Sequence, residues 1–291
     1  MISDDHARFF RENGYLVLSQ LLAAGELEAL RAEMQVLVTS AVERTGDVDF
    51  RYREHALTGE QVPFRIEYVV DKSAACRRLL GHPFVLGSVE KLQGPSFIPT
   101  WDSMVFKLEG AGAAIPWHRD AGPEQLLDER PIFNVDFYLD ASDRTNCLWA
   151  IPGSHRWDED EARERLAELS ADGFGTQFDD GGAAVPLELE PGDVLLHDIL
   201  VLHGSPAAQS RLRRVLYYEF RPIDVELAIG PHTPEYIPLK QQVLAACLRE
   251  RTRAFPDEEP FRYRPEPPVP DGEPASFRFP HEQFWRKNRP G

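Results

Sequence analysis

The sequence predicts a mainly β fold, a sandwich or barrel of short strands with helices at its flanks. Between about residues 65 and 230, short apolar or alternating runs are separated by Gly, Pro and Asp, which is typical of such folds. Pro191-Gly192-Asp193 is a turn signal between two of these runs. The expected strands of this segment cover residues 101–108, 132–139, 148–151, 185–189, 194–202 and 215–220.

The N-terminal region is expected to form two helices and a short strand. Ser3 suits an N-cap because two acidic residues follow it in the first turn, and Gly14 suits the end of that helix. Residues 15–18 then form a strand, and a second helix covers residues 25–44. Apolar residues recur there at three- and four-residue steps, at Leu27, Leu30, Met34, Leu37 and Val38.

Two further helices and a proline-rich tail complete the pattern. Residues 158–169 predict a helix inserted between strands, and residues 238–254 predict another. Residues 256–291 contain nine prolines, which exclude regular structure, yet they also carry more aromatic residues than a free linker usually has. We expect one domain of 291 residues, with a core at about 65–222, a helical layer at 3–45 and a C-terminal extension at about 235–291.

Composition excludes several classes of protein. The formal net charge of -16 disfavours binding to nucleic acid or to anionic membranes. No run of about 18 apolar residues predicts a membrane span. Three widely spaced cysteines, Cys76, Cys147 and Cys247, form no disulfide framework and no zinc motif. The free thiols suit a reducing cytosol, and we expect a cytoplasmic monomer or homodimer that binds neither nucleic acid nor a membrane.

Trp117-His118-Arg119-Asp120 is the clearest chemical motif. On a strand, His118 and Asp120 point to the same face, where an imidazole and a carboxylate supply two ligands of a facial triad for iron. The third ligand would be a distant histidine. His203 closes an apolar run and precedes Gly204-Ser205, and His197 competes with it. Along an extended strand these two histidines would lie about 20 Å apart, so only one can reach the metal. The residues that follow favour His203.

Arginines follow at the start of the next expected strand. A guanidinium ten or eleven residues after a metal-binding histidine can clamp a dicarboxylate through two parallel hydrogen bonds. Both Arg213 and Arg214 qualify, and because neighbouring strand residues face opposite sides, only one of them enters the barrel.

Together these motifs resemble the phytanoyl-CoA dioxygenase family of 2-oxoglutarate oxygenases. The resemblance covers about residues 5–222. Within this range, further matching segments are residues 9–17, 138–140, 146–155 and 191–193. It implies a double-stranded β-helix, or jelly roll, that uses Fe(II), 2-oxoglutarate and O2. By position it assigns the iron to His118, Asp120 and His203.

The family places the dicarboxylate arginine eleven residues after the distal histidine, at Arg214. The loop here is one residue short, and aligning the strand instead gives Arg213, so both remain candidates. Lys107, Asn134 and Trp149 fall on strands near the expected pocket and are further candidates for co-substrate or substrate contact. His155 is expected to play a structural part.

The resemblance predicts hydroxylation, or a related C–H oxidation, of a small organic substrate whose identity the sequence does not give. Two alternatives are a zinc hydrolase built on the same ligands and a jelly roll that binds a small molecule without catalysis. The hydrolase leaves the dicarboxylate arginine without a purpose, and intact metal ligands argue against the second alternative.

Overall fold

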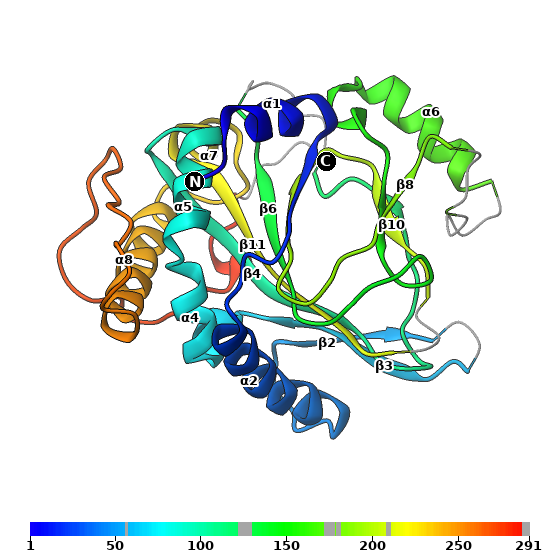
Figure 1. Cartoon of the computed structure of the whole chain (residues 1–291), viewed down its shortest axis with the longest axis horizontal. Helices are drawn as coiled ribbons and strands as arrows, with labels where there is room; N and C mark the ends of the chain where they lie inside the picture. The colour runs from blue at the N-terminus through cyan, green and yellow to red at the C-terminus, as the bar shows by residue number, and fades with distance from the viewer. Residues whose placement is uncertain (56–57, 122–129, 172–177, 179–181, 208–210, 287–291) are drawn as a thin grey trace.

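The computed structural model of the chain describes residues 1–55, 58–121, 130–171, 178, 182–207 and 211–286. Its strands form two antiparallel sheets, which confirms the mainly β prediction (Figure 1). The larger sheet has the order β1-β9-β6-β11-β4-β3-β2, with β1 (Tyr15–Leu18), β9 (Val194–Asp198), β6 (Phe133–Tyr138), β11 (Arg213–Pro222), β4 (Phe97–Lys107), β3 (Gln61–Glu67) and β2 (Phe50–Glu54). The smaller sheet has the order β5-β10-β7-β8, with β5 (Ile115–His118), β10 (His203–Ser205), β7 (Leu148–Ala150) and β8 (Val185–Leu187).

Helices cover the outer side of the larger sheet. In Figure 1, α2, α4, α5 and α8 gather on that side, and α6 lies beside the smaller sheet. The helices are α1 (Asp4–Asn13), α2 (Ala24–Val42), α3 (Val69–Lys72), α4 (Ala74–Leu80), α5 (Pro83–Gln93), α6 (Glu159–Leu169), α7 (Ile223–Ile229) and α8 (Tyr236–Ala254). The main apolar core fills the space between this helical layer and the sheet.

The expected boundaries of the N-terminal helix are confirmed. The Ser3 hydroxyl accepts a hydrogen bond from the His6 backbone N–H, and Gly14 ends α1 in the left-handed region at φ 78°. The Gly14 N–H donates to the Phe10 carbonyl at 2.7 Å. The predicted α2, α6 and α8 are also present, within two residues of the expected limits.

Two predictions need correction. Residues 194–202 were expected to form one strand, but β9 ends at Asp198, and the chain turns before β10 begins at His203. The Asp198 side chain accepts a hydrogen bond from the Leu200 N–H, which favours this turn over an extended chain. The segment from residue 65 to 230 was also expected to be almost entirely β, but it contains α3, α4, α5 and α7. Local signals start two of them, since Ser73 caps α4 and Pro83 opens α5.

The tail packs against the body of the protein. It contains no described α-helix or strand between 255 and 286, and a single 3-10 turn covers His281–Gln283. Phe261, Tyr263, Phe277 and Phe279 pack against the main core. We propose that the chain forms one domain, because the tail and α8 contribute to the same core as the sheet. The end of the predicted extension, 287–291, lies outside the described residues.

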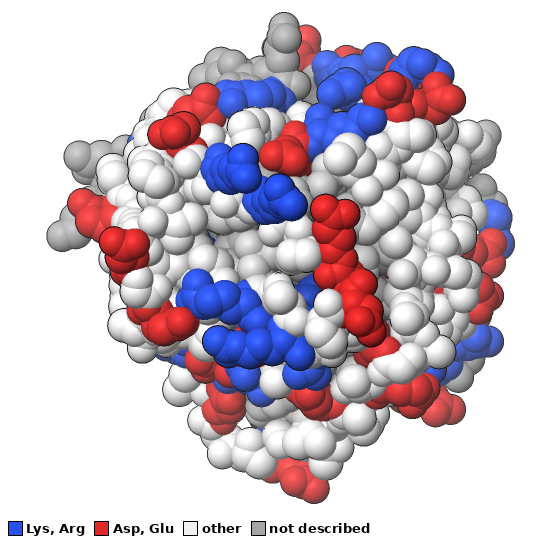
Figure 2. Space-filling view, turned by 60° about the vertical axis from the view of Figure 1, so that its left-hand side comes forward, with Lys and Arg blue, Asp and Glu red and all other residues white. Residues whose placement is uncertain are grey.

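Charges of both signs are mixed on the surface. Figure 2 shows one face on which basic and acidic side chains lie among each other, with wide areas of neither. Binding of a phosphate backbone would require a continuous patch of basic side chains. The face in Figure 2 has no such patch among the residues that the structure describes. No described helix is long and apolar enough to span a membrane.

Gly14 allows a stability prediction with a matched control. A Cβ atom at Gly14 would lie 2.6 Å from Val201 Cγ2, whereas one at Gly46, also at positive φ, would meet nothing within 4 Å. We expect Gly46→Ala to lower the free energy of unfolding by about 1–2 kcal/mol through backbone strain alone. Gly14→Ala should cost about 1–3 kcal/mol more because of the clash. Urea unfolding of both variants measures the difference, and equal losses would contradict the packing described here.

Candidate functional site

The two sheets bring together three side chains that can hold a metal ion. β5 and β10 pair in antiparallel register with His118 opposite His203, and the centroids of the two rings are 4.3 Å apart. Asp120 follows β5, where its backbone N–H donates to the Ile199 carbonyl at 2.8 Å. One donor atom from each of these side chains lies within 4.8 Å of the others. Two imidazole nitrogens and one carboxylate oxygen form the donor set of a facial triad.

The Asp120 carboxylate is held in one orientation. Its Oδ1 lies 3.4 Å from His118 Nε2 and 3.8 Å from His203 Nε2. Its Oδ2 points away from them, accepts a hydrogen bond from Asn134 Nδ2 at 3.0 Å and lies 3.4 Å from His197 Nε2. One oxygen is therefore free to bind a metal while the other is occupied by neighbouring side chains.

His197 lies much closer to the site than the sequence suggested. The expected separation of about 20 Å from His203 is wrong because the chain turns after Asp198, and the two ring centroids are 4.9 Å apart. The His197 Nδ1 lies 2.8 Å from Asp136 Oδ2, so this histidine connects two carboxylates. Burial opposes its protonation, but the charges of Asp136 and Asp120 outweigh burial and raise the pKa of His197 to about 10. His197 is thus placed beside the three donors, as a partner of Asp120.

The ring nitrogens of the other two histidines are arranged for metal binding. His118 Nδ1 lies 2.8 Å from the Pro116 carbonyl and His203 Nδ1 lies 3.0 Å from the Val201 carbonyl, so each Nδ1 carries the proton that the carbonyl accepts. Each Nε2 then faces Asp120. Burial opposes protonation of His118, but the hydrogen bond and charge of Asp120 outweigh burial and raise the pKa of His118. Burial, followed by the charge of His118, lowers the pKa of His203 to about 3, which keeps its imidazole neutral. Burial alone would raise the pKa of Asp120, but the neighbouring histidines hold it well below its usual value.

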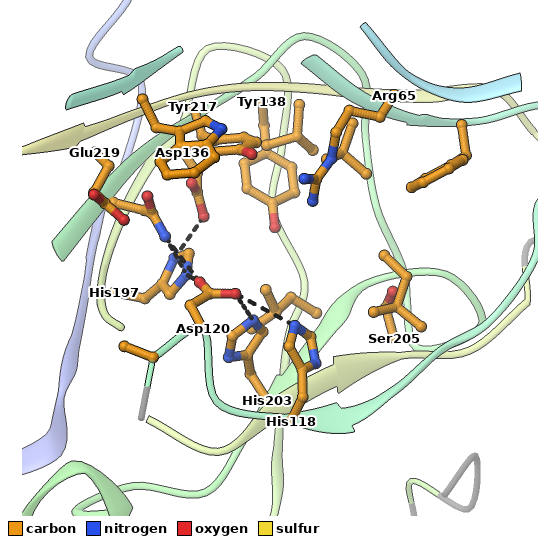
Figure 3. Close-up of a pocket in the computed structure, with 18 of the residues that line it drawn as sticks. Arg65, His118, Asp120, Asp136, Tyr138, His197, His203, Ser205, Tyr217 and Glu219 are labelled. Carbon is orange, nitrogen blue, oxygen red and sulfur yellow. Dashed lines mark hydrogen bonds and ion pairs between the residues drawn. The ribbon is translucent and has the colours of Figure 1, made fainter. Parts of the chain in front are cut away.

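The three donors line a cavity of about 430 Å³ between the sheets (Figure 3). Alternate residues of β11 form one wall of this cavity, from Arg213 at one end to Arg221 at the other. Asn134, predicted as a contact residue, also lines it, but Trp149 does not. Trp149 packs instead in a separate apolar cluster with Trp117 and Phe178.

The two candidate arginines point in opposite directions, as their adjacent strand positions require. Arg213 lines the cavity and donates to the Asn146 carbonyl, and its Nε is buried without a partner. Arg214 turns outward, where Asp140 binds its guanidinium through two hydrogen bonds of 2.8 Å. Arg213 is therefore the arginine of this pair that faces the cavity.

Lys107, opposite Arg213 on β4, donates to the Ser205 and Pro206 carbonyls. Burial, followed by the charges of Arg213 and Arg53, lowers the pKa of Lys107 to about 6. This lysine therefore holds the loop after β10 in place and contributes little positive charge at neutral pH.

His155 lies outside the cavity lining and contacts the Arg11 carbonyl through Nε2 at 3.1 Å, so we propose a structural part for it.

Several cavity residues were not predicted. Arg53 and Arg65 come from the β2–β3 hairpin, and Pro231 and Trp285 come from the C-terminal part of the chain. Trp285 belongs to the proline-rich tail, whose aromatic content is higher than that of a free linker. Nothing in the sequence around Arg53 or Arg65 distinguishes them from ordinary surface arginines. Their position at the cavity follows only from the packing of the β2–β3 hairpin against the edge of the larger sheet.

Comparison with known proteins gives a consistent result. The phytanoyl-CoA dioxygenase (PhyH) family pattern matches residues 10–215. Phytanoyl-CoA dioxygenase 1 of Oryza sativa subsp. japonica is 28% identical over 246 residues, which cover 72% of this chain and 83% of the rice protein.

Solved structures share the architecture. AviO1 from Streptomyces viridochromogenes Tue57 is 26% identical with a TM-score of 0.62, over 74% of this chain and 93% of AviO1. EctD from S. alaskensis, crystallised with 2-oxoglutarate and 5-hydroxyectoine, is 21% identical with a TM-score of 0.61, over 77% of each chain. At that identity the likeness concerns the fold alone, and it supports the expected jelly roll.

The contact between His197 and Asp120 predicts weaker metal binding when His197 is removed. We expect His197→Ala to retain a divalent ion but to bind it about 10–100-fold more weakly, because the Asp120 carboxylate loses a partner that orients it. Titration with Mn(II) under anaerobic conditions measures this affinity. Arg214→Ala serves as the control, since Arg214 faces away from the cavity. Complete loss of metal binding in His197→Ala would make it a ligand rather than a partner of one.

Proposed function

The chain belongs to the phytanoyl-CoA dioxygenase family and is an Fe(II)- and 2-oxoglutarate-dependent dioxygenase, and we propose that His118, Asp120 and His203 hold its iron. The observation that carries this proposal is the convergence of their donor atoms within 4.8 Å at a cavity wall. Two imidazole nitrogens and one carboxylate oxygen suit Fe(II), and the three coordination positions that they leave open suit a bidentate co-substrate and O2.

The Fe(II) ion, when bound, supplies the oxygen activation that couples oxidative decarboxylation of 2-oxoglutarate to hydroxylation, or a related C–H oxidation, of a small organic substrate. The protein provides orientation. Asn134 and His197 hold one oxygen of Asp120 so that the other faces the metal position. Backbone carbonyls fix the rings of His118 and His203 in the tautomer that offers Nε2.

We assign the distal carboxylate of 2-oxoglutarate to Arg213. Its guanidinium enters the cavity from the wall formed by β11, and its buried Nε lacks a partner that a carboxylate would supply. Arg214 is already paired with Asp140. A dicarboxylate arginine would have no role in the alternative of a zinc hydrolase. The intact donor set argues against a jelly roll that binds a small molecule without catalysis.

The buried free thiols of Cys76, Cys147 and Cys247 support our further proposal of a cytoplasmic location.

Removal of any one iron ligand should abolish turnover. We expect His118→Ala, Asp120→Ala and His203→Ala each to lose stoichiometric Fe(II), while His155→Ala keeps it. Metal analysis of purified protein and Mn(II) titration test the site independently of activity. Turnover itself should release one succinate and one CO2 for each oxidised substrate. A parent enzyme that oxidises its substrate without succinate would refute the assignment, and activity with zinc alone would indicate the hydrolase.

The two arginines should behave differently. Arg213→Ala should raise the dissociation constant of 2-oxoglutarate by about 10–100-fold, because a charge-assisted pair contributes roughly 1.5–3 kcal/mol. Arg214→Ala should leave this constant unchanged and should instead lower thermal stability, since Asp140 loses the two hydrogen bonds of 2.8 Å that Arg214 donates. Calorimetric titration of the Mn(II)-loaded variants with 2-oxoglutarate separates the two effects. If the two results are exchanged, the co-substrate lies on the other side of β11.

A further inference from the structure

Two arginines face the cavity without an acidic partner. Arg65 points into the cavity from the side opposite the three metal donors, as Figure 3 shows. Its Nε is buried with no hydrogen-bond partner, and it forms no ion pair within 4.0 Å among the described residues. Arg53 lies beside it, donates to the Ala114 carbonyl at 2.9 Å, and likewise has no acidic partner in the described part of the chain.

The same aromatic ring contacts both arginines. The guanidinium carbon of Arg53 lies 4.7 Å from the centroid of the Phe64 ring, and that of Arg65 lies 5.9 Å from it. Burial, followed by the charge of Arg65, lowers the pKa of Arg53. Two like charges this close, with no carboxylate between them, repel each other unless an anion binds there.

The other charged side chains of the cavity are already balanced. Glu219 accepts from Arg221 Nε at 2.7 Å, and Asp136 lies 2.8 Å from His197 Nδ1. Neither acid is therefore available to Arg53 or Arg65. The excess of positive charge is local, since the chain as a whole has a formal net charge of -16.

Bound Fe(II) and 2-oxoglutarate do not remove this excess. The two charges of the metal ion cancel those of the 2-oxoglutarate dianion, and Asp120 offsets one of the three arginines Arg53, Arg65 and Arg213. Two of these three positive charges then remain without an anion, and with 2-oxoglutarate at Arg213 the excess lies at Arg53 and Arg65. A cavity of about 430 Å³ has room for a further small molecule beside the co-substrate.

We propose that the primary substrate is a small organic anion whose carboxylate or phosphonate-type group binds beside Arg53 and Arg65. This inference rests on the proposed function, because it assumes that 2-oxoglutarate occupies the Arg213 end of the cavity. Phe64, Trp101 and Tyr217 also line the cavity and would contact the apolar body of such a molecule. The substrate class is thus an organic acid with an apolar or aromatic body.

Binding of matched probes tests the charge of the ligand. The protein is loaded with Mn(II) and saturating 2-oxoglutarate without O2, and is then titrated calorimetrically with benzoate, phenylphosphonate, benzamide and benzylammonium. We expect at least one of the two anions to bind about 10-fold or more tightly than benzamide, because a guanidinium pairs strongly with an oxyanion. The anion that binds more tightly identifies the preferred group. Equal affinity for the amide, preference for the amine, or no binding of either anion would overturn the proposal.

Variants then locate the binding group. Arg53→Gln and Arg65→Gln should each weaken the preferred anion about 10-fold and leave benzamide unchanged. Arg51→Gln is the matched control. This arginine lies on β2, as Arg53 does, but its guanidinium pairs with Glu67 at 2.6 Å. An anion affinity that neither substitution alters would overturn the assignment.

The affinity for 2-oxoglutarate separates this inference from the proposed function. Parent protein that binds Mn(II) and 2-oxoglutarate but no anionic probe refutes only the substrate class, whereas failure to bind Mn(II) and 2-oxoglutarate refutes the function itself. A steep loss of 2-oxoglutarate affinity in Arg65→Gln, with anion binding intact, would assign Arg65 to the co-substrate and overturn its part in the proposal.

Discussion

The site depends on the turn that carries the chain from the larger sheet to the smaller one after Asp198. Backbone hydrogen bonds fix this turn on two sides, since the Asp198 N–H donates to Gly14 and the Asp120 N–H donates to Ile199. The Ser154 hydroxyl accepts from the Leu202 N–H at 2.8 Å. As a result, His203 pairs with His118 on one sheet while His197 stays on the other sheet and reaches Asp120 from the opposite side. A straight strand would have separated the two histidines by the length of the barrel.

Sequence reasoning identified the parts of the site that have local signals. His118 and Asp120 are two residues apart, and the Gly-Ser pair after His203 is a recognisable motif. The strand alternation also showed that only one of Arg213 and Arg214 can face inward, although it did not show which one. The terminal helices were predictable for the same reason, because a cap, a stop signal or apolar spacing lies within a few residues of each end.

What could not be predicted depends on contacts between distant segments. The turn at residues 199–202 lies in an apolar run that is typical of a continuous strand. Besides the local bond to the Asp198 side chain, hydrogen bonds to Gly14, Ile132 and Ser154 hold it in place. Arg53 and Arg65 became visible as cavity residues only when β2 and β3 joined the edge of the larger sheet. The apolar helices between residues 69 and 93 were missed because their short runs do not distinguish a buried helix from a buried strand.

The walls of the cavity come partly from the segment that matches the family and partly from residues that follow it. The metal donors and Arg213 fall within the segment that matches the family, whereas Tyr217, Glu219, Pro231 and Trp285 lie beyond it. Trp285 is 47% exposed and comes from the tail, which Arg286 anchors to the carbonyls of His232 and Glu226. Contacts to the substrate are thus shared between the two stretches, because Arg53 and Arg65 lie inside the matched segment. Substitutions at Pro231 or Trp285 would change one wall of the cavity without touching the metal donors.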